Sequence, residues 1–141
     1  MPRRAITDNE IENCFNVMAE LRPHLNRSDC VATVRAMEAD GFCLAFIEQD
    51  GEVVAAAGYR IYTNLSMGKH CYVDDLVTAE SHRSKGFGEK MIDWLRTEAQ
   101  AADCKVFHLD SGTARDQAHK FYFAQGLTIA SYHFSEALTQ W

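Results

Sequence analysis

The sequence lacks any arrangement of cysteines or histidines typical of a disulfide framework or a metal site. Its five cysteines stand far apart, no Cys-x-x-Cys pair occurs, and their number is odd. The six histidines show no spacing typical of metal ligands. We therefore expect free thiols, a reducing compartment and no metal.

The sequence also lacks a long apolar run and an excess of basic residues. No run approaches the ~20 apolar residues of a membrane span, and the N-terminal residues show no apolar signal segment. The formal net charge is -6, whereas nucleic acids and anionic membranes attract basic surfaces. These absences predict a cytoplasmic protein without a nucleic-acid or membrane partner.

What the chain does contain suits a globular protein. Its 141 residues are 47% apolar and 24% charged, which is ordinary composition for a domain with its own core. We see no internal repeat, low-complexity segment or linker. A single domain over residues 1–141 is therefore expected.

Apolar periodicity and turn residues predict the order of the elements. A capping box at Thr7 and Glu10 begins an amphipathic helix that ends near Pro23, and a second helix ends before Gly41. Further helices are predicted over 87–99 and 115–125. The predicted strands cover 42–47, 52–62, 71–78, 105–109 and 127–134, with a hairpin turn at 50–51 and a bulge at 58. This order is typical of an α/β fold with a mixed sheet.

The segment SHRSKGFGEKM, residues 81–91, concentrates cations and glycines where a strand gives way to a helix. The first N–H groups of a helix lack partners and carry the positive end of its dipole, so they can bind phosphate. Met91 stands where a dinucleotide fingerprint needs a third glycine, and no Walker sequence occurs. On the glycines alone, an ordinary turn is the simpler interpretation.

Two motifs together carry a family resemblance. Residues 83–88, RSKGFG, fit Arg/Gln-x-x-Gly-x-Gly/Ala, which resembles the acetyl-coenzyme A motif of the Gcn5-related N-acetyltransferases. Residues 118–127 match that family's Ala-x-x-Phe-Tyr-x-x-x-Gly-hydrophobic segment. The resemblance implies a GNAT-like fold, with a mostly antiparallel sheet of six or seven strands and four helices. It also implies transfer of an acetyl group from acetyl-coenzyme A to a primary amine in a ternary complex.

The resemblance further implies where the coenzyme binds. Backbone groups of one strand would pair with the pantetheine arm, and an amide near Val77 would polarise the thioester carbonyl. Ser111 lies where the family often has an asparagine, which this sequence lacks. The implied coenzyme contacts are Leu76, Val77, Thr78, Arg83, Ser84, Lys85, Gly86, Phe87, Gly88, Glu89, Ser111 and Tyr122.

Acetyl transfer needs a base for the amine and an acid for the departing sulfur. A lysine-like amine is protonated at neutral pH because its pKa is about 10.4. Asp74 and Asp75 lie on one strand, and alternation predicts that at most one faces the acceptor. The segment from Tyr72 to Leu76 looks like the polyamine acetyltransferase branch, which favours Asp74 as the base, directly or through water. The alternative is a solvated surface carboxylate. The resemblance implies that Tyr122 is the acid.

The acceptor is less well defined than the donor. Tyr59, Tyr62 and the two aspartates suit a cation, with Tyr132 and His133 as further lining. Arg22, His24 and Arg27 suit an acid group instead. The segments around Tyr122 and Tyr132 also look similar to aminoalkylphosphonate acetyltransferases. A small-molecule amine is favoured, and polyamines, amino acids, aminophosphonates, antibiotics and protein amines all stay open. So do a coenzyme-binding module without turnover, a nucleotide-phosphate binder and a homodimer.

Overall fold

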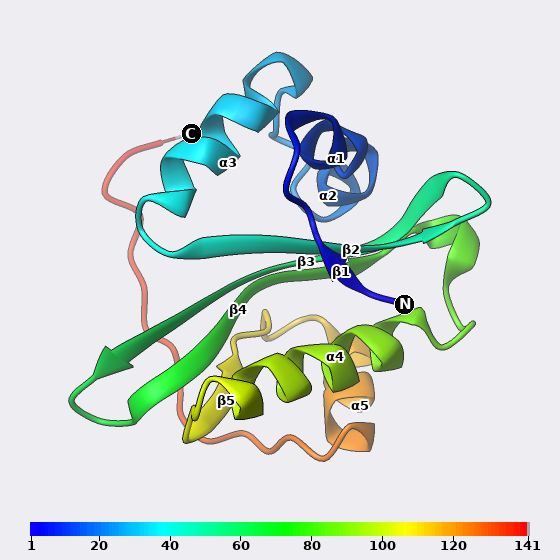
Figure 1. Cartoon of the computed structure of the whole chain (residues 1–141). Helices are drawn as coiled ribbons and strands as arrows, with labels where there is room; N and C mark the ends of the chain where they lie inside the picture. The colour runs from blue at the N-terminus through cyan, green and yellow to red at the C-terminus, as the bar shows by residue number, and fades with distance from the viewer. Residues whose placement is uncertain (141) are drawn as a thin grey trace. The chain divides into compact units, whose positions relative to one another are not determined.

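The structure is a computed structural model that describes residues 1–140. The chain forms two compact units, Met1–Leu109 and the residues from Asp110 onward. The first unit holds a sheet with strand order β1-β2-β3-β4-β5 (Figure 1). Its strands are β1 (Arg3–Arg4), β2 (Phe42–Gln49), β3 (Glu52–Asn64), β4 (Gly68–Thr78) and β5 (Val106–Leu109). Only β5 runs parallel to its neighbour. The predicted mixed, mostly antiparallel fold is confirmed, although residues 1–140 contain five strands instead of six or seven.

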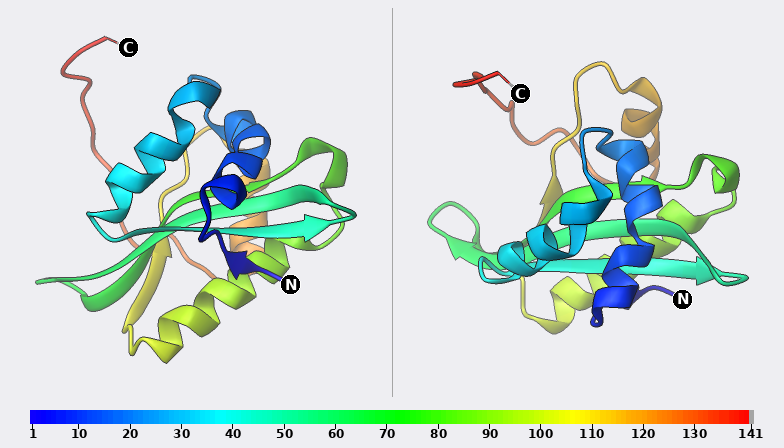
Figure 2. Two further views of the ribbon diagram at one scale, coloured as in Figure 1. Left: turned by 45° about the horizontal axis from the view of Figure 1, so that its top comes forward. Right: turned by 90° about the horizontal axis from the view of Figure 1, so that it is seen from above.

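Helices cover both faces of this sheet, as Figures 1 and 2 show for the first unit. One face, the α1–α3 face, carries α1 (Asp8–Asn13), α2 (Phe15–Leu21), η1 (Arg27–Asp29) and α3 (Cys30–Glu38). The opposite face, the α4 face, carries α4 (Phe87–Ala101), which follows the short η2 (Glu80–His82). The capping box at Thr7 is confirmed, but the predicted first helix is divided at Cys14 into α1 and α2.

Alternation along the strands divides the core into two layers. Ala45, Ala57 and Val73 pack with α4 on one face, and Leu44, Phe46 and Ala56 pack with the first helices on the other. Four α4 side chains of this layer recur at helical spacing, namely Phe87, Met91, Leu95 and Ala99. The sheet is therefore covered on both faces. The place of a β4 residue in this alternation determines whether its side chain points to the α4 face or to the α1–α3 face.

The hairpin between β2 and β3 forms at the predicted turn. Asp50 and Gly51 both have positive φ, 53° and 81°. A type I′ turn needs positive φ at its two central residues, which explains the Asp-Gly pair. The hairpin prediction is confirmed.

A β-bulge in β4 overturns one expectation about the two neighbouring acids. Gly58 pairs with Asp75 and the next residue, Tyr59, pairs with Val73, so Asp74 is an extra residue opposite β3. The prediction placed the irregularity at Gly58, and the inserted residue lies across from it. Because a bulge interrupts alternation, Asp74 and Asp75 do not point to opposite faces. Both lie on the α1–α3 face, and their contacts are described below.

The second unit contains one helix, α5 (Asp116–Ala124), and irregular chain up to residue 140. The strand predicted over 127–134 is wrong, because these residues form no ladder. Leu127 and Ile129 begin an apolar pattern at odd-numbered positions, but the polar Ser131 interrupts it. The aromatic residues Tyr132 and Phe134 then stand at even-numbered positions, which would lie on the opposite face of a strand. Such a pattern presents no single apolar face for a sheet.

The five cysteines are free thiols, as predicted. Burial raises the pKa of Cys14 and of Cys71 to about 12, so both remain protonated core residues. Across residues 1–140, no helix is long and apolar enough to cross a membrane. The same residues contain no cluster of three or more side chains that would hold a metal ion.

Candidate active site

Among residues 1–140, one half of β4 has no partner strand on one of its edges. β5 pairs with β4 only from His70 to Val73, whereas β4 continues to Thr78. The N–H of Ala79 donates to the carbonyl of Val54 at 2.8 Å, so alternate residues such as Val77 turn their backbone groups toward β3. Leu76 and Thr78 consequently turn theirs toward the open edge. An extended chain could add there as a further strand.

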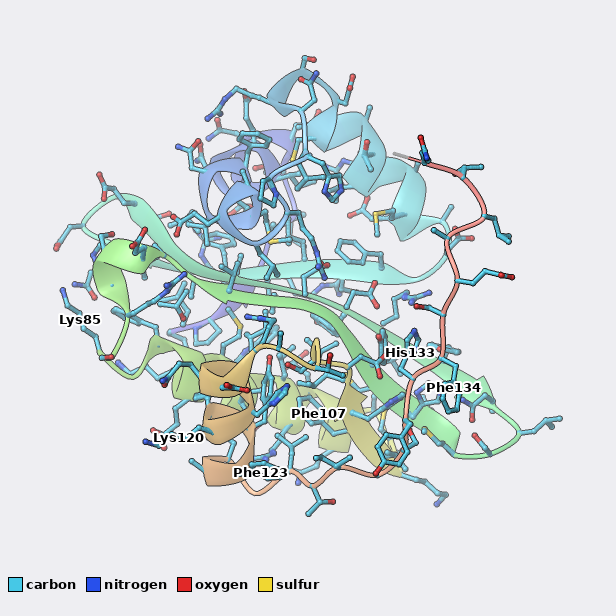
Figure 3. All side chains as sticks on the ribbon, turned by 180° about the vertical axis from the view of Figure 1, so that it is seen from behind. Lys85, Phe107, Lys120, Phe123, His133 and Phe134 are labelled. Carbon is cyan, nitrogen blue, oxygen red and sulfur yellow. The ribbon has the colours of Figure 1, made fainter. Side chains whose placement is uncertain are left out.

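The start of α4 presents a row of backbone donors. Gly86 precedes the helix with φ 85°, and no atom lies within 4 Å of the position that a Cβ would take there. The first amide bonded within the helix is that of Lys90, which donates to the carbonyl of Gly86 at 3.1 Å. The N–H groups of residues 85–89 donate no hydrogen bond to any other residue in the described range. Figure 3 shows the Lys85 side chain projecting from this loop. These donors and charges suit a phosphate group.

Two arginines hold the two acids of the bulge. Arg22 follows α2, and its Nε donates to Oδ1 of Asp75 at 2.9 Å while its Nη2 donates to the carbonyl of Asp74 at 3.1 Å. Arg60 on β3 donates from Nε and Nη2 to Oδ1 of Asp74, at 3.3 and 3.0 Å. We call Arg22, Arg60, Asp74 and Asp75 the paired-charge cluster.

Burial and pairing act against each other in this cluster. Burial raises the pKa of Asp75, and the neighbouring Arg22 guanidinium opposes part of that rise. The hydrogen bonds to Asp74 raise the pKa of Arg60, so this arginine remains charged. The side chains of Asp74 and Asp75 are 16% and 13% exposed. A carboxylate in such a place can exchange a proton with a bound group while staying shielded from bulk water.

The structure separates the predicted substrate residues. Tyr62 lies on the same face as Arg60, half exposed, with its ring centroid 4.2 Å from that of His70. His24 is exposed in the loop after α2. Tyr59 points to the α4 face, where it is 2% exposed and packs edge-on against Trp94. Because Tyr59 belongs to the core, we do not carry it forward as a substrate contact.

A histidine pair lies beside the cluster on the same sheet. Nε2 of His108 on β5 lies 2.8 Å from Nδ1 of His70. His70 is fully buried, and its Nε2 has no partner among residues 1–140. Burial lowers the pKa of His70, so it is neutral at pH 7.

Tyr122 and Ser111 belong to the second unit. Tyr122 lies on α5, and the N–H of Leu127 donates to its carbonyl at 3.1 Å, which closes the helix at Gly126. Burial raises the pKa of Tyr122, with Arg115 opposing, so the phenol keeps its proton at neutral pH. Figure 3 shows Lys120 and Phe123 on the same helix. The Ser111 hydroxyl oxygen is buried without a hydrogen-bond partner in the described range.

Arg60 is the site residue that sequence reasoning missed. It stands in the middle of a strand with no motif around it. Its partner Asp74 comes within reach only because the extra residue of the bulge shifts the register of β4. An arginine and an acid on strands predicted to be neighbours were the only available signal.

Comparisons with known proteins identify the family and the fold. The family model described as "Acetyltransferase (GNAT) family" matches residues 9–127. The uncharacterized N-acetyltransferase YhdJ of Bacillus subtilis is 30% identical over 122 residues, 85% of this chain and 86% of that protein. Aminoalkylphosphonate N-acetyltransferase of Salmonella typhimurium is 25% identical over 91 residues, 64% of this chain and 59% of that protein.

A solved structure shares the fold. The chain is similar to AAC(6')-Iy in complex with the bisubstrate analog CoA-S-monomethyl-acetylneamine, with a TM-score of 0.84 and 15% sequence identity. The match covers 99% of this chain and 98% of that one. At this identity the likeness establishes the common fold.

Proposed function

Because the chain belongs to the acetyltransferase (GNAT) family, we propose that it moves the acetyl group of acetyl-coenzyme A directly to a primary amine of a small molecule. The observation that carries this proposal is that the open edge of β4 is followed closely along the chain by the start of α4. Leu76 and Thr78 offer backbone groups on β4, and the unbonded amides of 85–89 follow less than ten residues later.

The residues at this place fit a coenzyme with an extended arm and a diphosphate. Leu76 and Thr78 would pair with the pantetheine amides, whereas Val77 is engaged with β3. Gly86 leaves space at the helix start, and Arg83 and Lys85 add charge next to the free amides. When bound, acetyl-coenzyme A supplies an acetyl group activated as a thioester. Ser84 and Ser111 stay proposed contacts.

Two side chains have the chemistry to move the protons. Asp74 would accept the proton of the incoming ammonium, directly or through a water, because Arg60 occupies only its Oδ1. Tyr122 would donate its proton to the departing sulfur, since its raised pKa keeps the phenol protonated. Both roles remain predictions from the resemblance.

The named relatives support a small acceptor. One is an aminoalkylphosphonate N-acetyltransferase, and the analog bound by AAC(6')-Iy carries an acetylneamine. Both names describe small-molecule amines. We extend that class, without a named member, to this chain.

The test combines binding with turnover. Calorimetry with acetyl-coenzyme A should show binding, and release of free thiol should require an added amine from a panel of amines. Asp74→Asn should lower the rate at saturating acetyl-coenzyme A without abolishing coenzyme binding. Binding without thiol release for any amine would instead identify a coenzyme-binding protein without turnover.

A further inference from the structure

The paired-charge cluster contains donors and acceptors that its own ion pairs do not use. Arg60 bonds Asp74 through Nε and Nη2, and Arg22 bonds the two acids through Nε and Nη2. The Nη1 groups of both arginines have no partner in the described part of the chain. Both carboxylates accept at Oδ1, and neither Oδ2 receives a hydrogen bond there.

The free guanidinium groups are held in place and belong to partly exposed side chains. Arg60 lies over the rings of Tyr62 and Tyr72, with 5.6 and 5.8 Å to their centroids. This stacking and the ion pair fix the plane of its guanidinium. The Arg22 and Arg60 side chains are 42% and 35% exposed. A ligand can therefore meet an oriented guanidinium without first breaking an ion pair.

The charge of the cluster excludes a simple trap for cations. Two arginines and two aspartates sum to zero, and each guanidinium touches Asp74. A diamine would bring a second cation against two arginines, where like charges repel. An amine that also carries an acid group offers an anion to the arginines and a cation to the carboxylates. Each remaining Nη1 is a charged donor, and its hydrogen bonds to carboxylate or phosphonate oxygens are stronger than those between neutral groups.

We propose that the acceptor is a small amine bearing an acidic group, with that group bound by Nη1 of Arg60 and Arg22 and the amine beside Oδ2 of Asp74. This inference rests on the proposed function and deepens it. Carboxylate and phosphonate share the chemistry that two guanidinium groups recognise, so the experiment includes one amine of each kind.

The experiment compares matched amines at saturating acetyl-coenzyme A. The probes are β-alanine, 2-aminoethylphosphonate, the uncharged analogue β-alaninamide, and 1,4-diaminobutane. The value of kcat/KM should be about 10- to 100-fold higher for an acid-bearing amine than for β-alaninamide, as expected for hydrogen bonds to a charged group. The ratio of kcat/KM between β-alanine and 2-aminoethylphosphonate shows whether the site prefers a carboxylate or a phosphonate.

Variants assign the preference to the cluster. The preference is the ratio of kcat/KM for an acid-bearing amine to that for β-alaninamide. It should fall about 10-fold, mainly through KM, in Arg60→Gln and also in Arg22→Gln. Each variant should also raise the relative rate with 1,4-diaminobutane, because one repelling cation has been removed. Arg4→Gln, an exposed arginine on β1, is the matched control and should keep the preference. Thermal melting of each variant verifies that it is folded.

Failure of the inference differs from failure of the proposed function. Equal rates for β-alanine and β-alaninamide, or a preference that survives both arginine variants, would overturn the inference while acetyl transfer stands. If no amine releases thiol, the proposed function fails. Calorimetry then measures the binding of 2-aminoethylphosphonate and of 1,4-diaminobutane to the protein with coenzyme A present, which tests the acid-binding site alone. Tighter binding of the diamine would overturn the inference.

Discussion

Deleting Asp74 would test whether β4 carries the extra residue that turns both acids to one face. Gly58 pairs with Asp75 and Tyr59 pairs with Val73, so the deletion joins two residue pairs that are already in register. Val73 keeps its place on the α4 face and Asp75 keeps its place on the α1–α3 face. We therefore expect a regular ladder and a folded protein.

The expected loss of stability is small because the deletion removes only polar contacts to Arg22 and Arg60, whose side chains are 42% and 35% exposed and can turn to water. Asp74 accepts from Arg60 at 3.0 Å, and its carbonyl accepts from Arg22 at 3.1 Å. An ion pair of this exposure contributes ~1 kcal/mol or less, and a hydrogen bond from a charged donor about 1.5 kcal/mol. The free energy of unfolding should fall by about 1–2.5 kcal/mol.

Deletion of Tyr72 is the matched control. It leaves the bulge in place and moves every earlier residue of β4 to the opposite face. His70 and Cys71, both fully buried, would exchange faces, so we expect a loss above about 4 kcal/mol or no folded protein. Urea unfolding followed by circular dichroism measures both deletions. If the Asp74 deletion unfolds the chain as the Tyr72 deletion does, the bulge has been assigned to the wrong residue.

Four further changes test the site and its surroundings. Gly58→Ala places a Cβ 2.5 Å from two ring atoms of Phe42, so overpacking should cost about 1–3 kcal/mol; an unchanged melting curve would contradict this. Gly86→Glu puts a carboxylate beside the free amides of α4, and calorimetry should find no binding of acetyl-coenzyme A; the control Gly86→Ala carries the same backbone strain without the charge, and equal affinities would remove this loop from the site. Tyr122→Phe should lower kcat by about 10²–10⁴-fold with little loss of coenzyme affinity, and an unaltered kcat would assign the proton to another group. Burial lowers the pKa of His70 below its ordinary 6.5, so the unfolded chain binds a proton first and stability declines as the pH falls through about 6.5. Between about pH 7.5 and about pH 5.5, the melting temperature of His70→Phe should therefore fall less than that of the wild type. An equal fall in both proteins would refute the assignment of this pH dependence to His70.

Features determined by neighbouring residues could be read from the sequence. The capping box at Thr7 and the Asp50-Gly51 turn depend on backbone conformations that only a few residue types favour. The start of α4 was also predictable, because a glycine, which tolerates positive φ, stands directly before an amphipathic pattern. Gly86 does adopt a φ of 85°. These signals fixed the order of the elements and the position of the loop with free amides.

Features determined by distant residues could not be read in the same way. The division of the first helix at Cys14 follows no local breaker, since neither glycine nor proline stands there. The segment over 127–134 has strand-forming residues, but a strand exists only where a partner completes its ladder. Which residue of a bulge is the inserted one depends on the register between two strands, so the sequence of one strand alone does not reveal it.

The bulge also explains why two of the proposed roles fall within a few residues of each other on β4. Val73 is the last residue paired with β5, and the inserted Asp74 follows at once. An extra residue increases the local twist of a strand, so β4 leaves its parallel neighbour where the two acids turn to the α1–α3 face. The open edge of Leu76 and Thr78 begins directly afterwards. A group bound along that edge would therefore end beside Asp74, whereas a regular strand would turn one of the two acids toward α4.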